Sequence, residues 1–188
     1  MIKKILFPIF SAFLAYRSFE LLNMLISSSP ANFSFLSALS MSAILNLFIT
    51  GVFAFPGFVF ATHRFLPNSY YQIKNPKLLN RIYDLIGVAY FKIFLLVSFW
   101  GKEKNKKKYF NGTKSGLINF DFQTKQSEFG HLGAFIVLIL ASLILLWHQH
   151  VITFLLTTII NIVFNFYPVI LQRKHRIQIE RLTHKISS

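Results

Sequence analysis

The chain of 188 residues is 54% hydrophobic, contains 23 Phe and has a mean hydropathy of +0.51. A soluble domain does not need so many apolar residues. Because these residues occur in long runs, the composition indicates membrane spans. With 20 Lys and Arg against 6 Asp and Glu the net charge is +14, which we attribute to membrane topology and not to a nucleic-acid partner. The absence of Cys excludes disulfides, thiolate metal sites and a Cys nucleophile.

Four apolar runs predict transmembrane helices over about residues 5–26, 35–62, 129–147 and 151–171. No small-residue cleavage site clearly follows the first run, so we expect it to be retained as a span. Pro56 interrupts the second run and predicts a kink there.

The positive charges predict the topology. The loop 27–34 holds no charge and the link 148–150 holds no Lys or Arg, whereas the N-terminal lysines, the middle segment 63–128 and the tail from Arg173 hold nearly all of them. Because Lys and Arg near span ends stay in the cytoplasm, we expect both termini and the middle segment on the cytoplasmic side.

The apolar stretch over about 82–100 predicts an interfacial or re-entrant helix and not a fifth span. Asp84 and Lys92 would each cost roughly 2.5–3.5 kcal/mol at the centre of a transmembrane helix. The basic run 102–108 then follows either as a solvated loop at the headgroups or as a dock for an anionic donor. The predicted fold class is an all-α integral membrane protein of one domain, with about four transmembrane helices in two hairpins plus this helix.

Two polar residues open the third span. Glu128 and His131 are three residues apart, so they share a helix face. A carboxylate beside an imidazole fixes which ring nitrogen carries the proton, as a general base requires. The alternative is an ordinary helix start with Ser127 as its N-cap. We expect no metal site, because carboxylate-bridged centres need a second Glu-x-x-His motif.

Further polar residues close the fourth span. Asn161 and Asn165 are four residues apart and either join packed helices or face a substrate. Arg173 and Arg176 either anchor the topology or grip a phosphate or carboxylate bidentately.

These motifs resemble those of the glycosyl-4,4'-diaponeurosporenoate acyltransferase family of bacterial carotenoid biosynthesis, over roughly residues 80–182. Glu128-Phe-Gly-His131 is similar to the family's Glu-x-x-His-like motif, and Asn165-Phe-Tyr-Pro-Val-Ile-Leu-Gln-Arg-Lys-His-Arg176 is similar to its Asn-x-Pro-…-Gln-Arg-Tyr-Asn-Arg-like motif. In this chain the proline is one place later, and Lys174 and His175 replace Tyr-Asn.

The resemblance implies a membrane acyltransferase that moves a fatty acyl group from acyl-CoA or acyl carrier protein to a hydroxyl of a glycosylated lipid or carotenoid. It implies a site at the cytoplasmic interface of the bacterial inner membrane, with membrane lipids as further partners and without a cofactor. On this reading His131 takes the proton from the hydroxyl, Glu128 holds the imidazole, and Gln172 or Asn165 donates to the oxyanion. The arginines of the second motif, Arg173 and Arg176, hold the phosphates of the donor.

Two other functions stay open on the sequence. The first is a non-enzymatic scaffold or assembly protein whose polar residues only pack helices. The second is a transporter subunit with Arg17, Glu20 and the Asn pair along its path. It is the weaker alternative, because a path needs polar residues near the midplane of several spans.

Overall fold

A computed structural model describes residues 2–97 and 113–187, and no β-strand occurs among them. The basic run 102–108 lies outside the described residues. The chain divides into two compact units: the first is Met1–Thr62 with Gly130–Phe166, and the second is His63–Phe129 with Tyr167–Ser188.

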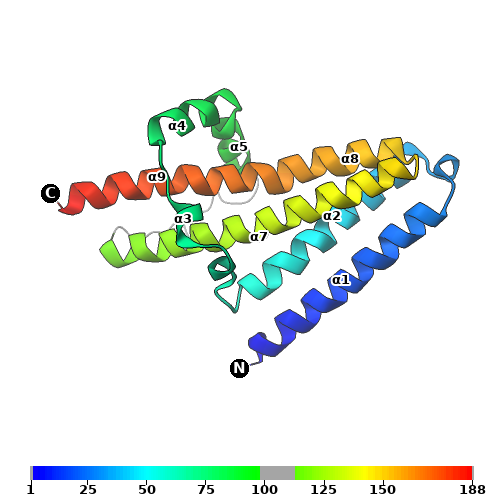
Figure 1. Cartoon of the computed structure of the whole chain (residues 1–188), viewed down its shortest axis with the longest axis horizontal. Coiled ribbons are helices and arrows are strands. Elements are labelled where there is room, and N and C mark those ends of the chain that lie inside the picture. Colours follow the sequence, from blue (N-terminus) through cyan, green and yellow to red (C-terminus); the bar gives the residue numbers. More distant parts are fainter. Residues whose placement is uncertain (1, 98–112, 188) are drawn as a thin grey trace. The chain divides into compact units, whose positions relative to one another are not determined.

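The first unit contains both predicted hairpins (Figure 1). Helix α1 (Lys3–Ser27) is followed by α2 (Phe35–Gly57), and α7 (Lys114–Trp147) is followed by α8 (Val151–Asn161) and by the π-helical turn η4 (Ile162–Phe166). The Ser34 side chain accepts from the backbone N–H of Ser37 and so caps α2. Helix α2 ends at Gly57, directly after Pro56, whereas hydropathy extended the span to about 62.

Within the described residues, four helical stretches are long and apolar enough to cross a membrane: Lys3–Ser27, Phe35–Gly57, Ser115–Trp147 and Val151–Thr183. The prediction of an all-helical membrane protein with four such helices is therefore confirmed. The third and fourth helices extend well beyond the apolar runs that predicted them, because the polar residues at their ends continue the same helices.

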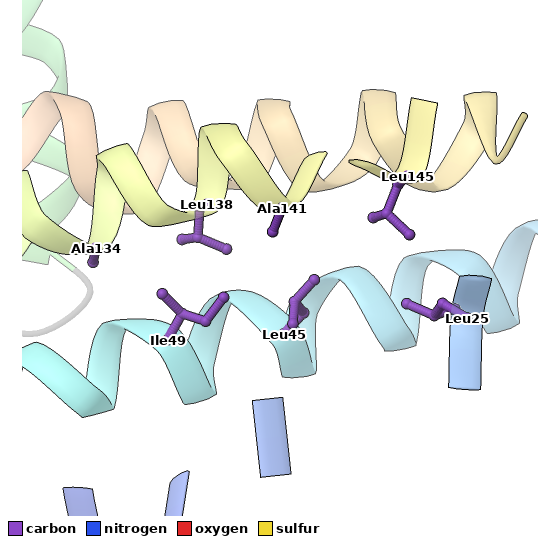
Figure 2. Close-up of a cluster of buried hydrophobic side chains, with 7 residues drawn as sticks. All are labelled: Leu25, Leu45, Ile49, Ala134, Leu138, Ala141 and Leu145. Carbon is purple, nitrogen blue, oxygen red and sulfur yellow. The ribbon is translucent and has the colours of Figure 1, made fainter. Parts of the chain in front are cut away.

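The core of the first unit lies where α1, α2 and α7 meet (Figure 2). Leu45 and Ile49 of α2 point toward four residues of α7, and Leu25 of α1 lies at one end of the row. The α7 residues recur every three or four positions and form one face of the helix: Ala134, Leu138, Ala141 and Leu145. Two of the four are alanine, which lets the helix backbones approach closely, as helices packed in lipid require.

The second unit contains α3 (Asn68–Tyr71), α4 (Pro76–Leu85), α5 (Val88–Leu95), η2 (Thr62–Phe65) from its second residue onward, α9 (Tyr167–Ser187) and the start of α7. Asn75 accepts from the N–H of Leu78 and caps α4. Tyr83 and Val88 pack on apolar residues of α9.

The stretch predicted as one helix over about 82–100 contains the end of α4 and the whole of α5. Gly87 separates these helices and has a φ of 75°, a conformation that glycine adopts without steric cost. Leu85, Tyr90 and Val97 are exposed, so this pair of helices carries apolar surface that the described chain leaves uncovered. Residues 98–100 lie outside the described part, and the interfacial placement remains a prediction.

Candidate functional site

An imidazole in the first unit is tied to an asparagine. Nδ1 of His131 on α7 lies 3.0 Å from Oδ1 of Asn165, which is in the π-helical turn η4. Thr50 of α2 donates to the same oxygen over 3.2 Å. Asn165 is fully buried, and His131 is half-buried. Three helical elements therefore hold one side-chain oxygen against the imidazole.

The hydrogen bonds around this oxygen fix the proton on the imidazole. Nδ2 of Asn161 donates to the carbonyl of Phe135, which can only accept, so Oδ1 of Asn161 accepts from Nδ2 of Asn165. Oδ1 of Asn165 must then be the acceptor for His131, whose Nδ1 carries the proton. In the neutral imidazole, Nε2 keeps its lone pair.

The backbone beside the imidazole is irregular. π-Helical turns occur frequently at functional sites, and here the turn brings Asn165 onto the face that meets His131. Pro168 has no N–H, so the carbonyl of Phe164, four residues earlier, loses its ordinary α-helical donor. That carbonyl lies beside the His131 imidazole.

A separate ion cluster occupies the second unit. Nε of Arg173 lies 2.8 Å from Oε1 of Glu128, and Nη2 of Arg176 pairs with Oε2 of the same carboxylate. Glu128 is fully buried, the Arg176 side chain is 2% exposed and that of Arg173 is 26% exposed. One carboxylate therefore binds the guanidinium groups of two arginines that are three residues apart on α9.

Two tyrosines of α3 cover these guanidinium groups. The guanidinium carbon of Arg173 lies 4.8 Å from the ring centre of Tyr70, and that of Arg176 lies 5.4 Å from that of Tyr71. Burial, and after it the charge of Glu128, raises the pKa of both tyrosines, so they are neutral at physiological pH. Neither tyrosine is among the site residues predicted from the sequence.

The sequence also offers no indication of the contacts of His63, a histidine of the second unit. Oε1 of Gln126 lies 2.7 Å from Nδ1 of His63 and also accepts from the backbone N–H of His63. The hydroxyl of Tyr71 donates to the carbonyl of His63 over 3.0 Å. His63 lies in the short 3-10 helix η2 and has no polar residue at helical spacing, so the sequence carries no signal that would have found it.

The other predicted positions lie on α9. Nε2 of Gln172 donates to Oγ of Ser127 over 3.2 Å. At the two departures from the family motif, Lys174 pairs with Asp84 over 2.6 Å and the His175 ring packs against Phe120. Lys174 therefore has an ion-pair partner within the second unit, whereas His175 has a ring contact and a buried Nδ1 with no hydrogen-bond partner among the described residues.

Glu128 and His131 lie three residues apart on the uninterrupted helix α7, as the sequence predicts. Their hydrogen bonds differ from the predicted pairing, because Glu128 binds the two arginines and His131 binds Asn165. Among the described residues, no group of three or more His, Asp or Glu side chains is arranged to hold a metal ion.

The fold and these clusters define a helical membrane protein with an oriented imidazole and a buried ion cluster. A family model described as glycosyl-4,4'-diaponeurosporenoate acyltransferase matches residues 67–185. The chain belongs to this family, and the resemblance seen in its motifs is confirmed. No curated protein and no solved structure gives a significant match.

Proposed function

We propose that this protein is a membrane acyltransferase that moves a fatty acyl group to a hydroxyl of a glycosylated lipid or carotenoid, with His131 as general base. The hydrogen-bond chain that ends on Nδ1 of His131 carries the proposal, because it leaves Nε2 able to accept a proton. A packing histidine would not need its tautomer fixed by a succession of buried amides. The family description supports acyl transfer as the reaction.

In the proposed reaction, Nε2 of His131 accepts the proton of the sugar hydroxyl while the hydroxyl oxygen attacks the acyl carbon of a thioester. The new C–O bond forms, the C–S bond breaks, and the leaving thiolate takes the proton back from the imidazolium. Asn165 holds the imidazolium in place between these steps. Acyl-CoA or acyl carrier protein supplies the thioester, and no cofactor takes part.

Asn165 is better suited to orient His131 than to donate to the oxyanion. Its oxygen accepts from His131 and Thr50, and its amide nitrogen already donates to Asn161. The role of oxyanion donor that the resemblance implies for Gln172 stays a prediction.

We further propose that both termini and the segment 63–128 face the cytoplasm of a bacterial cell, with the reaction at the inner face of its membrane. Lys and Arg are concentrated in these parts of the chain and absent from the two short connecting loops of the first unit. Both proposed substrates are apolar molecules with a polar reacting end. A site at the membrane interface lets the apolar part stay in lipid while the polar end stays in water.

The test is lipid and pigment profiling in a host that makes the glycosylated acceptor and carries wild type, His131→Ala or His148→Ala. His148 is an exposed histidine just after the other end of α7 and controls for loss of a histidine from this region. We expect His131→Ala to slow acylation by about 10²–10⁴-fold, Asn165→Leu by less, and His148→Ala not at all. Acylated products at wild-type level in His131→Ala, at equal expression, would refute the proposal and favour the scaffold alternative.

A further inference from the structure

The ion cluster of the second unit has one positive charge too many. It contains one carboxylate, that of Glu128, and the two positively charged guanidinium groups of Arg173 and Arg176. Because Tyr70 and Tyr71 are neutral, they do not balance the second arginine.

The other described acidic side chains of this unit do not pair with the two arginines, and one of them, Glu180, is exposed. Asp84 binds Lys174 over 2.6 Å, and Asp121 binds Lys125 over 2.6 Å. Among the described residues, Glu128 is the carboxylate that the two arginines share. An uncompensated charge of this kind is costly once it is removed from water.

The inner arginine also has unused donors. Nε and Nη1 of Arg176 are buried and have no hydrogen-bond partner within the described part of the chain. A buried donor without an acceptor costs about 1–3 kcal/mol, and more when it is charged. A single bound oxyanion would supply both the negative charge that balances the second arginine and the acceptors for the free N–H groups of Arg176.

We propose that Arg173 and Arg176 form a binding site for a phosphate-type oxyanion. Arg173, with 26% of its side chain exposed, is the side from which the anion enters, and Arg176 supplies the buried donors. The rings of Tyr70 and Tyr71 hold the planes of the guanidinium groups. Glu128 is a positioning residue, because its two oxygens set the spacing of the arginines.

Planar guanidinium groups suit this ligand, because each can donate two parallel N–H bonds to phosphate oxygens. The phosphate could belong to a soluble acyl donor or to a phospholipid headgroup. A role for the site in holding the donor rests on the proposed function, but binding of the anion is measurable without any turnover.

The experiment uses the full chain in a neutral detergent, titrated with coenzyme A and competed with inorganic phosphate. A second arm measures thermal stability in nanodiscs of phosphatidylcholine with and without phosphatidylglycerol. The variants are Arg173→Gln, Glu128→Gln and the control Arg181→Gln, which removes an equal charge from an exposed position of α9. Arg176 is left intact, because its loss would leave Glu128 with one partner.

We expect Arg173→Gln to weaken binding by about tenfold or more and Arg181→Gln to leave it within about twofold. Glu128→Gln keeps the size of the side chain between the arginines but removes its negative charge, which competes with the ligand, so this variant should bind severalfold more tightly. Phosphate-competed binding of coenzyme A that Arg173→Gln weakens identifies the soluble donor. Phosphatidylglycerol-dependent stabilisation that Arg173→Gln abolishes identifies the headgroup.

The proposal is overturned if the wild type binds neither probe, or if Arg173→Gln and Arg181→Gln behave alike in both arms. Its failure is separable from that of acyl transfer. If acyl transfer persists without anion binding, only the proposed anion site is refuted. If anion binding is intact and His131→Ala retains full transfer, only the proposed reaction is refuted.

Discussion

Two glycines of α7, one on each side of His131 and separated by less than one helical turn, should respond oppositely to the same substitution. A Cβ added at Gly133 would lie 2.5 Å from Cδ1 and Cε1 of the Phe53 ring. That is about 1 Å inside the ordinary carbon–carbon contact distance of about 3.5 Å. A Cβ added at Gly130 would have its nearest neighbour, the Phe53 carbonyl oxygen, at 3.7 Å.

The expected difference follows from this overlap. Overpacking a close helix contact costs about 1–3 kcal/mol, whereas replacing glycine by alanine in a helix stabilises it by up to about 1 kcal/mol. The second contribution is common to both variants and cancels when they are compared. Gly133→Ala should therefore be about 1–3 kcal/mol less stable than Gly130→Ala. In a chain of this size that corresponds to a Tm lower by about 2–12 °C.

The assay is thermal unfolding of the purified full chain, with both variants in the same detergent. Phe53→Ala in the Gly133→Ala background tests the cause, because removing the ring should reduce the cost of the new methyl group to below about 0.5 kcal/mol. Equal Tm values for the two glycine variants, or an unchanged cost without the Phe53 ring, would refute the steric argument.

Two further predictions concern the second unit. Glu128→Ala leaves two guanidinium groups without their carboxylate and should lower the free energy of unfolding by about 3–5 kcal/mol in denaturant titration. The double variant Glu128→Leu with Arg176→Met should recover most of that loss, and no recovery would show that the charges are not its cause. Tyr71→Phe should cost about 0.5–1.5 kcal/mol at neutral pH, through the lost bond to the His63 carbonyl. Because burial and then Glu128 raise the pKa of folded Tyr71 above 10.0, the folded chain keeps a proton that the unfolded chain loses, so wild-type stability should fall as pH rises above about 10. Unfolding measured from pH 7 to 11 should show a shallower decline in Tyr71→Phe, and identical slopes would contradict this assignment.

Hydropathy predicts the parts of the helices that lie in lipid but not the full length of the helices. The starts of α1 and α2 fall within about two residues of the predicted positions, because a change of polarity and a helix end coincide there. Helix α7 begins at Lys114, about 15 residues before the predicted span, because its first turns are polar and helical at once. The reverse holds at Gly57, where backbone chemistry ends the helix inside an apolar run.

The sequence identified chemically informative residues but not their partners. Helical spacing correctly places Glu128 and His131 within one turn of α7, yet spacing along a helix does not say which neighbouring element each side chain meets. The π-helical turn at Asn165 shifts the face of that residue, and a 3.6-residue period does not predict such a turn. Tyr70 and Tyr71 reach the cluster from a four-residue helix, which is too short to show any periodicity.

Helix packing and a catalytic role need not be competing explanations for the buried polar residues of the first unit. Polar side chains on one face of α2 meet polar groups of α8 and η4 in consecutive contacts: Ser42 with Thr153 and Thr157, Asn46 with Thr157, and Thr50 with Asn165. In lipid such bonds join helices, each contributing about 0.6 kcal/mol on average. The last contact differs from the others, because the oxygen that accepts from Thr50 also accepts from the imidazole of His131. The same row that aligns α2 with α8 therefore sets the position of Asn165, and through it the proton on His131.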